Sequence, residues 1–81
     1  MANANMRFDR IVLDPHQMNG QPCIRGTRLT VRRVVQLAAL YPERIELTRE
    51  FPELTDDDVR QALEFAALRL EDRIVELEPG N

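Results

Sequence analysis

The chain has one cysteine, one histidine and no lysine, and these scarcities exclude several classes of protein. A single cysteine cannot form an internal disulfide, and Cys23 with His16 cannot complete a four-ligand zinc site. No apolar run approaches the roughly 18 residues of a membrane-spanning helix, so we expect no membrane partner. Residues 1–6 are polar and lack the apolar stretch of a secretory signal, so we expect a cytoplasmic protein.

The length and the charge distribution set the next limits. A chain of 81 residues is one domain at most and buries only about 60% of its extended surface, so a second copy would help it fold. The net charge of -3 conceals an asymmetry, because residues 1–40 carry six arginines against two acids, whereas residues 41–81 carry five arginines against twelve acids. The chain is therefore electrically polarised along its length, and this asymmetry matters for the choice of partner more than the total charge does.

The first third of the chain predicts a β arm over residues 10–28. Residues 10–13 are largely β-branched and apolar, Asn19-Gly20 is a strong turn signal, and residues 22–25 form a second short strand closed by Gly26. Gly20 and Gly26 are the expected turn-forming residues, because both positions call for the freedom of glycine. Two short strands are barely stable in water, so they must pair with another chain or lie on helices.

Helical spacing of apolar residues begins after the arm. We expect helices over residues 30–40, 43–50 and 56–77, with Pro42 in the first turn of the second and a tail at 79–81. Thr30 and Thr55 are the expected N-caps, and Asp58 makes an acidic capping box with Thr55. The expected fold is mainly α: three helices of the helix-turn-helix class with a short N-terminal β arm, spanning residues 10–78 after a flexible lead-in at residues 1–9.

No residue set predicts an enzyme. His16 is expected to be an exposed turn residue and Cys23 a small buried apolar group, rather than a base and a nucleophile. Asp56, Asp57 and Asp58 point about 100° apart on a helix, so they cannot form one oxygen cage for a cation; they suit the positive end of the helix dipole instead. We therefore expect no cofactor, no metal and no small-molecule substrate.

Two blocks of sequence resemble a known family. G-Q-P-C-I-R-G-T-R-L-T-V, followed by F-P-E-L-T-D-D-D-V-R-Q-A-L-E-F-A, resembles the domain of unknown function 433, whose members are predicted antitoxins of type II toxin–antitoxin pairs. The match runs from about Arg10 to Ala67. The resemblance implies a homeodomain-like helix-turn-helix, often dimeric, and a neighbouring PIN-like nuclease toxin. It departs from many members at Leu40-Tyr41-Pro42, where they have a glycine and then a serine-capped helix start.

The resemblance predicts an antitoxin that also binds double-stranded operator DNA. Phosphate contacts are expected from Arg25, Arg28, Arg32 and Arg33, although a solvated charged turn is the alternative for this cluster. Arg60 and Gln61 could contact bases, but three aspartates at the start of the same helix would repel phosphate. The alternative function is a helix-turn-helix-derived protein-interaction module without DNA binding.

Partner contacts are expected at the C-terminal part of the long helix. Its apolar residues exceed one helical stripe, and arginines stand among them. The expected contact residues are Phe65, Leu68, Arg69, Arg73, Val75 and Leu77. They would bind a PIN-like toxin, whose carboxylate-lined site would attract cations, or they would complete a homodimer; the sequence leaves both uses open.

Overall fold

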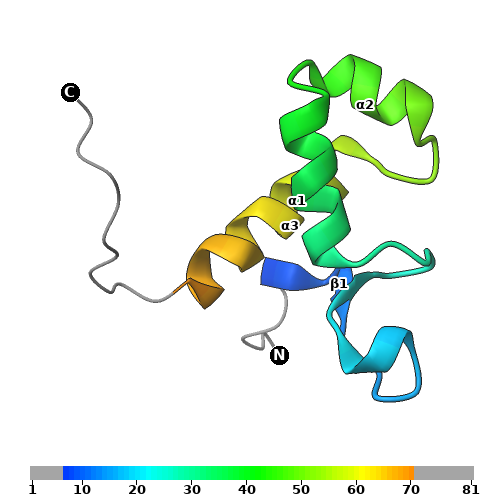
Figure 1. The fold of residues 1–81 in the computed structure, drawn as a ribbon, viewed down its shortest axis with the longest axis vertical. Coiled ribbons are helices and arrows are strands. Elements are labelled where there is room, and N and C mark those ends of the chain that lie inside the picture. Colours follow the sequence, from blue (N-terminus) through cyan, green and yellow to red (C-terminus); the bar gives the residue numbers. More distant parts are fainter. Residues whose placement is uncertain (1–6, 71–81) are drawn as a thin grey trace.

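The computed structural model describes residues 7–70 and contains three helices beside a small sheet (Figure 1). The elements follow the order β1 (Ile11–Val12), the single-turn 3-10 helix η2 (Met18–Gly20), β2 (Cys23–Ile24), α1 (Val31–Leu40), α2 (Arg44–Glu50) and α3 (Asp56–Arg69). This confirms the predicted mainly α fold with an N-terminal β arm. None of these helices has the length and apolar character that spanning a bilayer requires.

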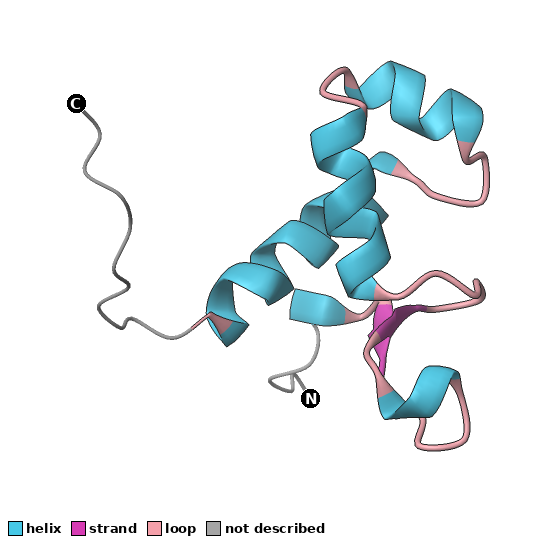
Figure 2. Ribbon diagram, viewed as in Figure 1, coloured by secondary structure: helices cyan, strands magenta, loops and turns pink. Residues whose placement is uncertain are grey.

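The two strands pair with each other and rest on the helices (Figure 2). They run antiparallel, with Ile11 opposite Ile24 and Val12 opposite Cys23. The backbone N–H of Ile24 donates to the carbonyl of Leu29 at 2.9 Å, and the N–H of Val31 donates to the carbonyl of Pro22 at 2.8 Å. The arm therefore needs no second chain to form its sheet, and these bonds join it directly to the start of α1.

Both predicted turn glycines have left-handed backbone conformations. Gly20 has φ of +77° and Gly26 has φ of +78°. The Asn19-Gly20 turn is tight: Met18 and Asn19 also have positive φ, and the N–H of Gln21 donates back to the carbonyl of Met18 at 3.1 Å. A side chain at Gly26 would meet no atom within 4 Å, so the backbone angle alone favours glycine there.

The core lies between α1 and α3 and is closed by α2 and the arm. Its fully packed members come from every element except η2 and β1: Ile24, Val31, Val34, Leu37, Leu47, Leu54, Val59 and Ala62. Cys23 is also buried, as predicted. Because α2 contributes only Leu47 to this cluster, it is held by few apolar contacts, while α1 and α3 form the main pair of packed helices.

Both predicted threonine caps form. The Thr30 hydroxyl accepts from the N–H of Arg33 at 3.0 Å, and the Thr55 hydroxyl accepts from the N–H of Asp58 at 3.0 Å. The Asp58 carboxylate in turn accepts from the N–H of Thr55 at 3.0 Å, which completes the capping box. The start of α2 differs from the prediction, because its N-cap is Glu43 and Pro42 therefore precedes the helix.

The end of α3 also differs from the prediction. The helix was expected over residues 56–77, but it ends at Arg69, and Leu70 has an extended backbone with φ of -79° and ψ of 134°. Short helices are stabilised by packing more than by propensity, and Leu68 and Leu70 are 59% and 77% exposed. The last turn of α3 therefore makes few apolar contacts that could stabilise a longer helix. Residues 71–81, with the predicted tail, lie outside the described residues.

The predicted lead-in over residues 1–9 is too long. The Phe8 ring packs edge-on against Phe65, with ring centroids 5.4 Å apart, and the Gln61 amide donates to the Asp9 carboxylate at 2.8 Å. Residues 7–9 are therefore anchored on α3 by apolar and polar contacts that the local sequence pattern did not indicate. Residues 1–6 lie outside the described residues.

Candidate nucleic-acid interface

Four exposed arginines surround the start of α1, and we call them the arginine face. Arg25 and Arg28 lie on the loop between β2 and α1, and Arg32 and Arg33 lie in the first turn of α1. Within residues 7–70 none of the four forms an ion pair. Arg25 is partly engaged, since its Nε donates to the carbonyl of Asp9 at 2.9 Å. The structure therefore gathers these four predicted phosphate ligands at one end of α1.

The position of these arginines is unfavourable for the helix itself. The N-terminus of a helix carries a partial positive charge, and acidic side chains normally offset it. The first turn of α1 contains no acidic residue and places Arg32 and Arg33 there instead. Like charges at this end raise the local positive potential, and a bound anion would relieve it. The start of α1 is thus the part of the described chain best suited to meet a phosphate backbone.

The start of α3 is acidic, and its carboxylates already have cationic partners. Asp56 pairs with Arg44 at 2.8 Å, and Asp57 accepts from Nε of Arg60 at 3.0 Å. The hydrogen bonds from Arg60, and then from Gln61, lower the pKa of Asp57 below its ordinary value. The same Asp57 contact raises the pKa of Arg60. At this end of the helix the described acidic and basic side chains are already paired with each other, so no unpaired cation is present there for a phosphate.

The two predicted base-contacting residues are therefore engaged elsewhere. Gln61 is only 2% exposed; its Oε1 accepts from the N–H of Arg10 at 3.0 Å, and its Nε2 donates to Asp9 and Asp57 at 2.8 Å each. Because the Gln61 amide is buried and fully hydrogen-bonded, a contact with a base would require these hydrogen bonds to break. Arg60 is half exposed but pairs with Asp57 and, at 3.2 Å, with Glu64.

A polar cluster of the partly exposed Arg10 and the buried Asp58 and Gln61 joins the arm to α3, and the sequence did not predict it. The Asp58 carboxylate is fully buried and accepts from Nε of Arg10 at 2.6 Å. This hydrogen bond raises the pKa of Arg10. One local signal was present: Asp58, Gln61, Ala62 and Phe65 have the i, i+3, i+4, i+7 spacing of a single helical face. The partner of that face, 48 residues away at Arg10, leaves no local signal.

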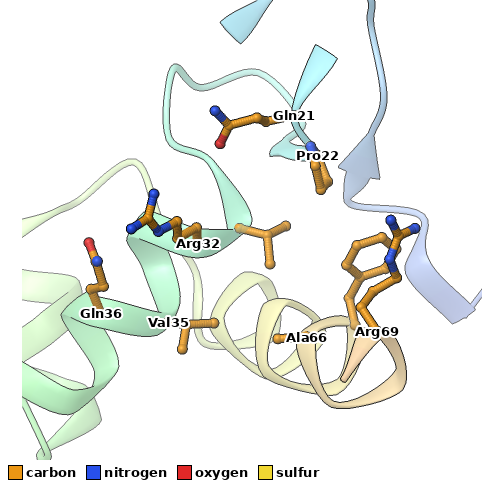
Figure 3. A pocket seen from close by; sticks show the side chains of 9 residues that line it. Gln21, Pro22, Arg32, Val35, Gln36, Ala66 and Arg69 are labelled. Atoms are coloured by element: carbon orange, nitrogen blue, oxygen red, sulfur yellow. The ribbon is translucent and has the colours of Figure 1, made fainter. Parts of the chain in front are cut away.

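A groove lies beside the arginine face, between α1, the C-terminal half of α3 and the residue before β2. Its volume is about 440 Å³, and its floor is apolar, formed by Val31, Val35, Phe65 and Ala66 with Pro22. Arg32 and Arg69 stand on opposite sides of it (Figure 3). None of the described residues that line the groove is acidic. The groove thus combines an apolar floor with two cationic edges.

The predicted partner-binding residues fall into three groups. Phe65 and Arg69 line the groove, and the Arg69 guanidinium lies 5.7 Å from the centre of the Phe65 ring. Phe65 also packs against Phe8 and the core, so it has a use within the chain that its place off the main stripe did not indicate. Leu68 is exposed outside the groove. Arg73, Val75 and Leu77 lie outside the described residues.

The structure gives the His16 and Cys23 pair no support as base and nucleophile. His16 is exposed on the turn after β1, and its backbone N–H donates to the Asp14 carboxylate at 2.9 Å. Cys23 is 2% exposed, and burial raises the pKa of its thiol, which disfavours the reactive thiolate. Between residues 7 and 70 no group of histidine, cysteine and acidic side chains has the arrangement of a metal site.

Three helices and an N-terminal two-stranded β arm make this protein a small, mainly helical domain. A family model described as "Protein of unknown function (DUF433)" matches residues 11–66, and the chain belongs to this family. The match covers both strands, α1, α2 and most of α3. Searches of curated proteins and of solved structures gave no match.

Proposed function

We propose that this chain is an antitoxin that binds and neutralises a PIN-like ribonuclease toxin and represses its own operon by binding DNA. The arginine face carries the proposal: four exposed arginines meet at a helix N-terminus and form no ion pair within residues 7–70. Phosphate contacts of this kind supply most of the affinity of a protein for DNA. The family resemblance supports the antitoxin role.

The proposed docking of DNA differs from that of a homeodomain in one respect. A homeodomain-like domain places its third helix in the major groove, but here that helix begins with Asp56, Asp57 and Asp58. We propose that the start of α1 and the preceding loop contact the phosphates, with the acidic start of α3 directed away from them. A second copy would double the number of arginines along the duplex, as expected for a homodimer.

The proposed toxin contact lies at the other end of α3. Leu68 and Arg69 are exposed there, and Arg73, Val75 and Leu77 follow beyond the described residues. A PIN-like active site gathers carboxylates around divalent cations, so arginines flanked by apolar side chains would complement it. Arg69 lies on the side of the α1–α3 groove opposite Arg32, so the proposed toxin contact adjoins the arginine face without using the same residues.

A salt titration of DNA binding tests the proposal. The full chain is titrated against a labelled duplex from the region upstream of its gene, at several salt concentrations between about 50 and 200 mM. We expect affinity to fall steeply, with a slope of about -0.9 for each phosphate contacted. In parallel, co-expression with the adjacent PIN-like reading frame should yield one complex without ribonuclease activity. Failure to form this complex would contradict the proposed antitoxin function.

A protein-interaction module without DNA binding is the second candidate. The paired acidic start of α3 and the apolar groove favour it, because both suit a protein partner better than a phosphate backbone. The same titration separates the two candidates. A chain that binds the toxin, yet shows no salt-sensitive affinity for any duplex, is a module of this second kind.

A further inference from the structure

The groove between α1 and α3 has no occupant among residues 7–70, and its chemistry is specific. Its floor includes Val35 and Ala66, and Arg32 and Arg69 flank it. The groove is open to solvent along its length, and its volume of about 440 Å³ is large enough to receive several side chains of an extended segment. An occupant would therefore present aliphatic side chains to the floor and negative charges to the two edges.

One segment of this chain has that composition. Residues 74–78 read Ile-Val-Glu-Leu-Glu, with three aliphatic side chains, two carboxylates and no cation. The segment begins four residues after Leu70, the last described residue, and Arg69 at the edge of the groove is the last residue of α3. Charge and apolar content thus match between the groove and a part of the same sequence.

The geometry at the end of α3 favours a groove on another copy. Helices that reverse direction commonly do so through a left-handed residue after the last turn, usually glycine or asparagine. Leu70 instead has φ of -79° and ψ of 134°, and no glycine, proline or asparagine occurs between residues 70 and 78. The backbone at Leu70 thus makes no reversal toward the groove beside α3.

We propose that residues 74–78 of one copy bind in the α1–α3 groove of a second copy, and that reciprocal exchange of this segment forms the homodimer. The aliphatic side chains of the segment cover Val35 and Ala66, and Glu76 and Glu78 pair with Arg32 and Arg69. This inference concerns self-association and does not rest on the proposed antitoxin function. Because the same residues are candidates for toxin contact, the test uses the full chain alone.

The first test measures self-association by sedimentation at protein concentrations from about 1 to 100 µM. We expect wild type to dimerise, Leu77→Asp to weaken the dimer about 10- to 100-fold, and Arg32→Glu/Arg69→Glu to weaken it about tenfold. Leu40→Asp and Arg49→Glu are the matched controls, since both side chains are exposed away from the groove. Unchanged far-ultraviolet circular dichroism and a cooperative melting transition would show that each variant is folded.

The second test separates exchange between copies from binding within one copy. Leu77→Asp disables the segment and leaves the groove intact. Arg32→Glu/Arg69→Glu disables the groove and leaves the segment intact. Mixed together, they can still form one intact contact between copies, so we expect a heterodimer where neither variant dimerises alone. A dimer that survives both substitutions, a monomeric wild type, or a mixture without a heterodimer would each overturn the proposal. Adding Glu76→Arg and Glu78→Arg to the groove variant should restore its dimer.

Discussion

The starts of α1 and α3 share one capping geometry and have opposite charge. In each, a threonine hydroxyl accepts from a backbone N–H three residues later at 3.0 Å. After Thr55 come three aspartates, and all three meet arginines of the same chain. After Thr30 come Arg32 and Arg33, which have no ionic partner within residues 7–70. The charges at the start of α3 are paired within the fold, whereas those at the start of α1 have no ionic partner among residues 7–70.

The charges at the two helix starts affect the stability of the fold in opposite directions. Acidic residues at a helix start stabilise it by about 0.3–1 kcal/mol each, whereas arginines there act in the opposite direction. The fold therefore gains from the start of α3 and loses from the start of α1. Arg32 and Arg33 lower the stability of the fold and make few contacts within it. A binding function would explain why they are there.

The largest expected effect comes from removing the buried carboxylate of α3. Asp58→Ala leaves Arg10 without its partner and the N–H of Thr55 without its acceptor. We expect a loss of about 2–3 kcal/mol of unfolding free energy, less than for a fully buried pair because Arg10 is partly exposed. The melting temperature should fall by about 10 °C or more. Asp56→Ala, whose side chain is 75% exposed, is the control and should change stability little.

The two caps should have similar and smaller effects. Thr55→Ala and Thr30→Ala each remove one hydroxyl acceptor, so each should cost about 1 kcal/mol, a few degrees in melting temperature. Serine at either position retains the acceptor and is the matched control. If Thr30→Ala were neutral while Thr55→Ala was not, the equivalence of the two helix starts in cap geometry would be refuted.

Removing charge from the start of α1 should stabilise the protein. Arg32→Gln/Arg33→Gln keeps good helix formers but removes two cations from the positive end of the dipole. We expect a gain of about 0.5 kcal/mol in unfolding free energy, measured by denaturant unfolding at low salt. Arg49→Gln removes a cation from the last turn of α2, where a cation is favourable, so it should lower the free energy of unfolding. Loss of stability in the first variant would indicate a structural role for these arginines.

The smallest effect concerns Asp57 and pH. Its pKa is lowered in the folded chain, chiefly by Arg60, so its contribution is complete above the unfolded value of about 3.9. The contribution disappears as the pH falls through the lower folded value, where the carboxyl becomes protonated. Asp57→Asn should therefore have a slightly lower melting temperature than wild type at pH 6, and this difference should shrink as the pH falls below about 3.9. A difference that does not shrink as the pH falls would show that the ion pair is not its source.

The sequence predicted local features well and distant contacts poorly. The Thr55–Asp58 capping box, Thr30 and the turns at Gly20 and Gly26 depend on neighbours within a few residues, and the sequence displays those directly. Gln61 was predicted to contact DNA because it is a polar residue near the N-terminus of the third helix. Its burial, however, depends on Arg10, 51 residues away in the sequence. The predicted end of α3 differs from the observed one because apolar spacing in the sequence continues past Arg69, whereas Leu68 and Leu70 are exposed and add little packing at the end of the helix.

The most direct test of the contrast between the two helix starts is the salt dependence of DNA affinity in matched variants. For Arg32→Gln/Arg33→Gln we predict weaker binding to every duplex and a salt slope shallower by about two units, one for each lost phosphate contact. For Arg60→Gln, whose guanidinium is already paired with Asp57 and Glu64, we predict the wild-type slope. A shallower slope for Arg60→Gln, with the α1 variant unchanged, would contradict the assignment of DNA contact to the start of α1.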